Sequence, residues 1–72
     1  MIEISNSQAF GELIKAERKR QKVTQAELAA LAGVGIRFIR ELENGKQTCQ
    51  LGLAFGVAVT LGISITANTR DS

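Results

Sequence analysis

Two short helices with a glycine turn between them are encoded from Thr24 to Lys46, and this block restricts the fold more than any other part of the 72-residue chain. Thr24 and Glu27 have the spacing of a capping box, in which the Thr hydroxyl accepts from a backbone amide and the Glu side chain reaches back to the cap. A helix of about two turns therefore begins here. It ends at Gly33, because glycine most readily takes the left-handed conformation that follows a helix.

The second helix of the block follows a short connection formed by Val34 and Gly35. Its apolar residues recur at helical spacing, and Asn44 with Gly45 provides the stop signal. Two short helices form a DNA-reading unit only when the positions at their crossing are small or apolar. The block meets this condition at Ala29, Gly33, Val34, Ile39 and Leu42.

Two further helices are predicted on either side of this block. Capping side chains precede a helix from Ser7 to Gln21, whose basic end complements the helix dipole. After the block, Thr48 is placed to cap a helix from Cys49 to Leu61. This last helix has no polar stripe, which predicts burial on more than one side. In so small a protein its second side needs a partner, so we expect a subunit interface there.

The tail beyond Gly62 alternates apolar and polar residues, as a short strand does. Because a single strand is not stable alone, we expect it to pair with its equivalent in a second chain over residues 62–68, with 69–72 as a frayed end. The whole chain is then one domain that forms a homodimer. The residues assigned to dimerisation are Leu61, Ile63 and Ile65.

The composition argues against an enzyme or a metal protein. The chain has no His and a single Cys, so it lacks a Cys–His pair, a Ser–His–Asp triad and a Cys/His metal site, and we expect no cofactor. The lone Cys49 and the absence of a signal-peptide pattern suit a reducing cytoplasm. Residues 51–67 carry no charge, but their polar interruptions and strand-like end argue against a membrane span.

The sequence of the block resembles the lambdoid phage repressor and Cro family of helix-turn-helix proteins, also called XRE-type. The resemblance is carried by Thr-Gln-Ala-Glu-Leu-Ala from Thr24 and by Glu-Leu-Glu-Asn-Gly-Lys from Glu41. It implies an all-α domain of four to five helices with the lambda-repressor fold. In such repressors the second helix of the pair lies in the major groove, while the first crosses the DNA backbone. By position, DNA contacts are implied for Gln25, Gly35, Ile36, Arg37, Arg40, Glu41, Asn44 and Lys46.

The chemistry of the second helix supports these contacts. Arg37 can give two hydrogen bonds to guanine, and Ile36 can contact a thymine methyl group. If Arg37 and Arg40 were only solvated residues of an amphipathic helix, the apolar Ile36 beside them would have no purpose. Glu41 is ambiguous, because a carboxylate in the groove repels phosphate unless it accepts from cytosine or pairs with an arginine. The resemblance implies phosphate contacts for Gln25, Asn44 and Lys46, and Arg40 can grip phosphate instead of a base edge.

The resemblance also implies that Arg18 pairs with Glu43, which would make Arg18 structural. The rest of its basic cluster remains available for phosphate contacts, at Lys15, Lys19 and Lys22. The net charge is only +2, so this local cluster matters more than the total. The chain departs from the family at Gly35, where a capping Ser or Thr is frequent.

A narrower resemblance is to HipB-type antitoxins of toxin–antitoxin operons, through the Gly-Val-Gly and Arg-Phe-Ile stretches between Gly33 and Glu43. It implies a homodimer that represses its own operon and restrains a HipA-like serine/threonine kinase. The small size fits a stand-alone phage or restriction-control regulator equally well. A protein-interaction module whose main task is toxin binding is a third hypothesis.

Overall fold

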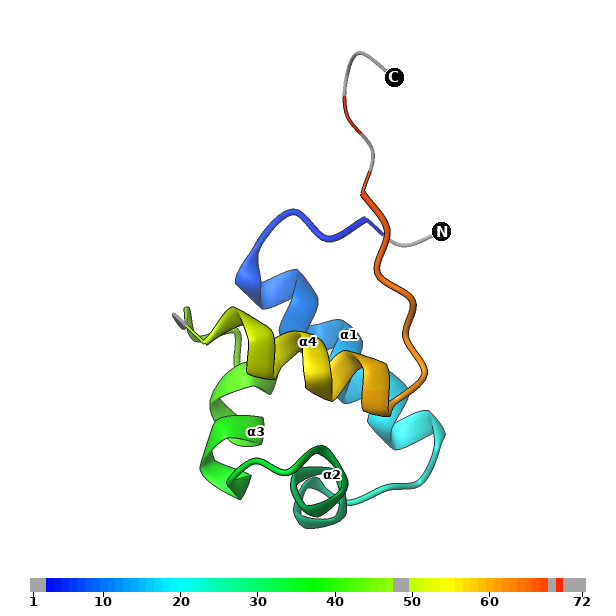
Figure 1. Ribbon diagram of the computed structural model, residues 1–72, viewed down its shortest axis with the longest axis vertical. Helices are drawn as coiled ribbons and strands as arrows, with labels where there is room; N and C mark the ends of the chain where they lie inside the picture. The colour runs from blue at the N-terminus through cyan, green and yellow to red at the C-terminus, as the bar shows by residue number, and fades with distance from the viewer. Residues whose placement is uncertain (1–2, 48–49, 68, 70–72) are drawn as a thin grey trace.

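The computed structural model describes residues 3–47, 50–67 and 69, and within them the chain forms four helices and no strand. The helices are α1 (Ser7–Arg20), α2 (Gln25–Ala32), α3 (Ile36–Glu43) and α4 (Leu51–Thr60). Figure 1 shows α4 crossing in front of α1, with α2 and α3 below them and the described segments before α1 and after α4 above them. The predicted all-α fold of the lambda-repressor type is confirmed in its helices.

The ends of the central helices form where their local signals lie. The Thr24 hydroxyl accepts from the Glu27 amide at 3.0 Å, and the Glu27 carboxylate accepts from the Thr24 amide at 2.8 Å, which completes the capping box. This second contact, to the backbone of Thr24, lowers the pKa of Glu27. α2 then ends at Gly33, whose φ of +72° lies in the left-handed region that disfavours residues with a Cβ.

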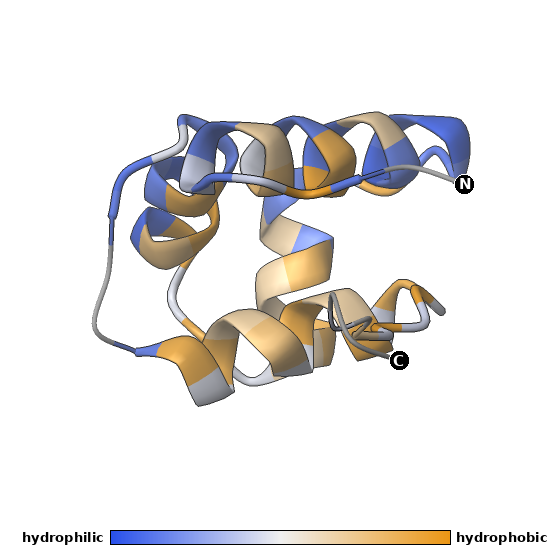
Figure 2. Cartoon of the chain, turned by 90° about the horizontal axis from the view of Figure 1, so that it is seen from above, coloured by the Kyte–Doolittle hydropathy of each residue, from blue (hydrophilic) through white to orange (hydrophobic). Residues whose placement is uncertain are grey.

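One apolar core joins the four helices. α1 contributes Ile14, and α4 contributes the largest share, from a single side of its cylinder. Figure 2 shows α4, the helix that follows the short grey trace, as apolar over nearly its whole length. Its other side is therefore an exposed apolar surface. The buried core residues are Ile14, Leu28, Ala29, Ile39, Leu42, Ala54, Val57, Ala58 and Leu61.

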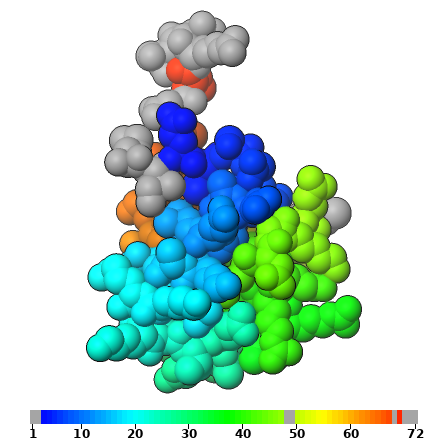
Figure 3. Space-filling view, turned by 180° about the vertical axis from the view of Figure 1, so that it is seen from behind, coloured from blue at the N-terminus to red at the C-terminus, as the bar shows by residue number. Residues whose placement is uncertain are grey.

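α1 and α3 approach each other closely at Gly11. A Cβ added at this residue would lie 2.2 Å from the carbonyl oxygen of Leu42 and 3.0 Å from that of Glu43. In the view from behind, α1 lies directly beside α3 (Figure 3). Gly45 repeats this tight packing just after α3, because its φ is +78° and an added Cβ would lie 2.8 Å from the Cα of Gln8. Two glycines thus set how α1 lies against the end of α3.

The structure corrects the predicted fourth helix at its start. α4 begins at Leu51 rather than Cys49, and its N-terminal cap is Gln50, whose side chain makes no capping hydrogen bond. Thr48, the predicted cap, and Cys49 lie outside the described residues. None of the helices in the described part of the chain reaches the length and hydropathy that a membrane span requires.

The tail differs from its prediction in two respects. Residues 62–67 form no strand in the single chain, and Asn68 lies outside the described residues. Leu61, assigned to dimerisation from the sequence, is only 5% exposed because its side chain belongs to the chain's own core. Gly62 ends α4 as predicted, with φ of +80°, and the Ile63 amide donates to the Ala58 carbonyl at 2.9 Å. This turn brings Ile63 against the core.

Candidate nucleic-acid interface

The turn between α2 and α3 sets the direction of α3. The amide of Gly33 donates to the carbonyl of Ala30 at 3.3 Å, and that of Val34 donates to Ala29 at 3.0 Å. These bonds occupy the last carbonyls of α2 and turn the chain sharply. α3 then begins after Gly35, which has no side chain to accept from the amides of its first turn. The Phe38 amide donates to the Gly35 carbonyl at 3.0 Å, so the first turn of α3 is held by the backbone and has no side-chain cap.

One face of α3 is exposed and chemically mixed. Arg37 and Arg40 are three positions apart, and Ile36–Arg40 and Arg37–Glu41 are four apart, so these pairs are neighbours on the helix surface. Ile36 is 37% exposed, and the side chain of Arg37 is 85% exposed. The opposite face holds the buried Ile39 and Leu42, which attach the helix to the core. The exposed face consists of Ile36, Arg37, Arg40 and Glu41.

A buried ion pair holds the C-terminal end of α3. Arg18 of α1 donates from Nε to Glu43 Oε2 at 2.6 Å and from Nη2 to Glu43 Oε1 at 3.0 Å, so the pair is bidentate. A third bond from Arg18 Nη1 to the Val23 carbonyl, at 2.9 Å, attaches the loop after α1. The hydrogen bond to Glu43 raises the pKa of Arg18 above its ordinary value. The ion pair implied by the family resemblance is thus present.

Gln25 joins this ion pair from the first turn of α2. Its Nε2 donates to Glu43 Oε1 at 3.1 Å. One carboxylate therefore connects α1, α2 and α3, which fixes the angle between the two helices of the block. The family resemblance predicts a phosphate contact for Gln25, and the sequence contains no signal for this bond to Glu43. Its half-buried side chain is held by Glu43, and a phosphate contact remains a prediction.

Glu41 is paired within the chain rather than left alone on the exposed face. Its Oε2 accepts from Lys46 Nζ at 2.8 Å and lies 3.5 Å from Arg37 Nε. The Lys46 contact lowers the pKa of Glu41, and the nearby Arg37 acts in the same direction. From the sequence, either a cytosine contact or an arginine pair is expected for this residue. The structure contains the arginine pair and adds a lysine that was not foreseen.

The remaining residues predicted to contact the DNA backbone are exposed in the structure. Asn44 and Lys46 are exposed just beyond α3. Lys15 in the middle of α1, Lys19 in its last turn and Lys22 in the loop after it are exposed, whereas Arg20 is paired with Glu17 of the same helix. The cations of the candidate site thus lie on α3, in the turn after it and along α1.

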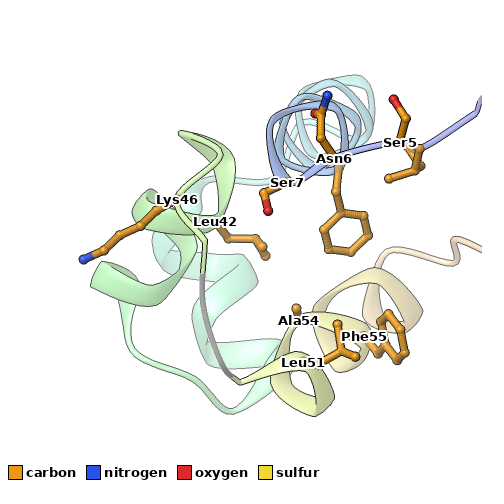
Figure 4. A pocket seen from close by; sticks show the side chains of 10 residues that line it. Ser5, Asn6, Ser7, Leu42, Lys46, Leu51, Ala54 and Phe55 are labelled. Carbon is orange, nitrogen blue, oxygen red and sulfur yellow. The ribbon is translucent and has the colours of Figure 1, made fainter.

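A second, largely apolar surface begins next to the end of α3, since Leu42 and Lys46 line its first groove. An open groove of about 340 Å³ separates the start of α1 from the start of α4. Figure 4 shows Ser5, Asn6 and Ser7 on one side of it, with Leu51 and Phe55 of α4 on the other. A neighbouring groove of about 530 Å³ continues to the tail, where Ile63 and Ile65 line it.

Comparison with known proteins places this arrangement among characterised folds. Residues 14–68 match the family model described as Helix-turn-helix. Over 56 residues the chain is 53% identical to an uncharacterized HTH-type transcriptional regulator, y4mF, of Sinorhizobium fredii, and the match covers 78% of this chain and 74% of the relative.

Solved structures with a similar fold cover nearly the whole chain. The chain in a HipB–O2 20mer complex is 26% identical and has a TM-score of 0.86, with 97% of both chains covered. The corresponding chain in the HipA–HipB–O2–O3 complex has the same TM-score of 0.86 at 24% identity, with 97% of this chain and 99% of that chain covered.

Proposed function

This chain belongs to the helix-turn-helix family, and we propose that it is a sequence-specific DNA-binding transcriptional repressor that reads its operator with α3. The observation that carries the proposal is the exposed face of α3 formed by Ile36, Arg37, Arg40 and Glu41. A guanidinium gives two parallel hydrogen bonds to guanine, and an aliphatic side chain contacts the methyl group of thymine. This face therefore carries the groups that read base edges.

The support for α3 comes from the other helices. The Arg18–Glu43 pair and Gln25 hold α3 against α1 and α2, so its exposed side chains start from a fixed backbone. Phosphate contacts from Lys46 and Asn44 would then set the register of α3 along the duplex, because such contacts position a protein without reading sequence. Base contacts and backbone contacts are thus assigned to separate residues.

Arg37→Ala is expected to reduce sequence discrimination, whereas Lys46→Ala is expected to reduce the affinity for DNA of any sequence. Arg37→Ala should lose discrimination at one or two base pairs, by about 1–3 kcal/mol, because it removes a bidentate guanine contact. Lys46→Ala should weaken binding to every sequence alike, because it removes one phosphate contact. For the same reason the slope of the logarithm of the binding constant against the logarithm of the salt concentration should become shallower by about 1. Titration of single-base variants of an operator selected from a random duplex library measures both. Equal losses on every sequence for Arg37→Ala would mean that it contacts only phosphate.

We propose further that the repressor is a two-fold dimer that binds half-sites about one helical turn apart. One recognition helix makes too few base contacts for specificity on its own. α4 exposes Leu51, Phe55 and Val59 at intervals of four residues, so they form one apolar stripe, and Leu51 and Phe55 line the grooves. The exposed Ile65 extends this surface into the tail. A second copy of the chain would cover it.

Deleting residues 64–72 tests the dimer without removing the core. Leu61 and Ile63 stay in place, so each monomer should remain folded, as circular dichroism would show. Affinity for the two-fold operator should fall at least about tenfold, because two half-sites no longer bind as one unit, while affinity for random DNA falls less. Sedimentation should show a shift toward monomer. A truncated chain that binds the two-fold operator as tightly as the intact one would exclude the tail from the interface.

We also propose that the operon regulated by this chain is a HipBA-like toxin–antitoxin operon, in which the chain restrains a kinase toxin. The support is the likeness in fold, over 97% of this chain, to HipB chains bound to DNA. The experiment is co-purification of the tagged chain with the product of the adjacent gene, followed by assay of that product for serine/threonine kinase activity. A neighbouring gene without a kinase-like product would favour a stand-alone phage or restriction-control regulator.

A further inference from the structure

Glu41 connects the two cations on which the proposed DNA contacts depend. Its Oε2 lies 2.8 Å from Lys46 Nζ and 3.5 Å from Arg37 Nε. Arg37 is assigned to base reading and Lys46 to the DNA backbone, so a single carboxylate oxygen contacts one residue of each kind. Arg40 lies on the same face, and it forms no ion pair within the described ranges.

The backbone holds Lys46 beside Glu41 independently of the ion pair. The Lys46 amide donates to the Glu41 carbonyl at 3.0 Å, and the Gly45 amide donates to the Leu42 carbonyl at 3.1 Å. The left-handed Gly45 makes this turn, which folds the chain back onto the end of α3. Removing the charge of Glu41 would therefore free the Lys46 ammonium group while leaving its Cα in place.

We propose that Glu41 is a specificity-determining residue that withholds Arg37 and Lys46 from phosphates of arbitrary sequence. This inference rests on the proposed function and deepens it. On random DNA the two cations must leave Glu41 to reach phosphates, and the carboxylate then faces the negative backbone without a partner. On the operator, Glu41 gains a hydrogen bond from an exocyclic amine of cytosine while Arg37 takes guanine. The carboxylate thus lowers the affinity for random DNA more than it lowers the affinity for the operator.

The Glu41 carboxylate is charged near neutral pH, where it would compete with DNA phosphates for Arg37 and Lys46. The Lys46 hydrogen bond lowers the pKa of Glu41, so the carboxylate is ionised near neutral pH and takes up a proton at a lower pH than an unpaired glutamate does. Measurements near neutral pH therefore compare a charged side chain with the neutral amide of Glu41→Gln. Glutamine keeps nearly the same shape and still accepts hydrogen bonds, which limits the change to the charge.

The test measures the binding of a random-sequence duplex, and of an operator selected from a library, by fluorescence anisotropy. Glu41→Gln is expected to bind the random duplex about three- to fivefold more tightly than the wild type, since an exposed ion pair contributes little more than this. Its affinity for the operator should not rise, so its specificity ratio falls. Glu12→Gln removes the same charge from an exposed position on α1 and should leave both affinities nearly unchanged.

A double-mutant cycle distinguishes withheld cations from simple repulsion of phosphate by the carboxylate. In a Lys46→Gln background the effect of Glu41→Gln on the random duplex should shrink, whereas in an Arg40→Gln background it should persist. If Glu41→Gln raised the affinity for the random duplex equally in the wild-type, Lys46→Gln and Arg40→Gln backgrounds, the inference would be overturned and repulsion would remain as the cause. The inference would also be overturned if Glu41→Gln and Glu12→Gln bound the random duplex with the same affinity. If the wild type binds no duplex at all, the proposed function itself fails.

Discussion

Replacing Gly11 with alanine is expected to lower the free energy of unfolding by about 3 kcal/mol or more, which is at the upper end for overpacking in a core. The new methyl carbon would lie 2.2 Å from the Leu42 carbonyl oxygen, so α1 and α3 would have to separate. A chain of 72 residues has a total stability of only about 4–11 kcal/mol. The melting temperature should therefore fall by more than about 10 °C, as measured by circular dichroism.

Gly52→Ala is the matched control for Gly11→Ala. Gly52 also lies in a helix, but an added Cβ there meets nothing within 4 Å. Alanine at that position should stabilise the protein by up to about 1 kcal/mol, because glycine loses more conformational freedom than alanine when a helix forms. The same substitution is thus expected to have opposite signs at the two positions. A Gly11→Ala protein as stable as the wild type would show that α1 and α3 have room between them.

Arg18→Met is expected to cost about 3–5 kcal/mol, because among the described residues it leaves the buried Glu43 carboxylate with Gln25 alone as a hydrogen-bond partner. Glu43 is 6% exposed, so water cannot replace the guanidinium fully. Chemical denaturation measures the loss. The double variant Arg18→Met/Glu43→Leu should recover much of it, since a buried ion pair replaced by apolar residues is often tolerated.

Arg20→Met separates this effect from the loss of an ordinary surface ion pair. Arg20 also pairs with a glutamate, Glu17 of the same helix, but both side chains remain accessible to water. That substitution should change stability little, because exposed ion pairs contribute little. If Arg18→Met and Arg20→Met were equally mild, the Arg18–Glu43 pair would not be what holds α3 to α1. The DNA affinity of Arg18→Met should fall together with its stability.

The family resemblance predicted more of the candidate site than the local sequence signals did. The exposed face of α3 and the Arg18–Glu43 pair were both expected by position, and the structure contains them. The internal partners of Gln25 and Glu41 were not predicted. Both bonds depend on where long side chains lie once the helices have packed, and sequence spacing specifies that only within a single helix.

The tail shows a similar limit. Leu61 was grouped with Ile63 and Ile65 because all three are apolar and lie near Gly62. In the folded chain Leu61 is buried under α4, Ile63 is half-buried and Ile65 is exposed, so only the last is fully available to a second chain. The strand predicted from alternation requires a partner edge, which a single chain does not provide.

The sequence by itself determined where the central helices begin and end. The capping box at Thr24, the left-handed turn at Gly33 and the stop at Gly45 each depend on residues within about one helical turn of one another, so their hydrogen bonds form without the rest of the fold. Only the tertiary structure decided how closely α1 lies against α3. Gly11 is a poor helix former when considered locally, and the reason for it is a carbonyl oxygen 31 positions further along the chain, at Leu42. Distances between segments that far apart are set when the whole core packs, because each helix must satisfy all its neighbours at once.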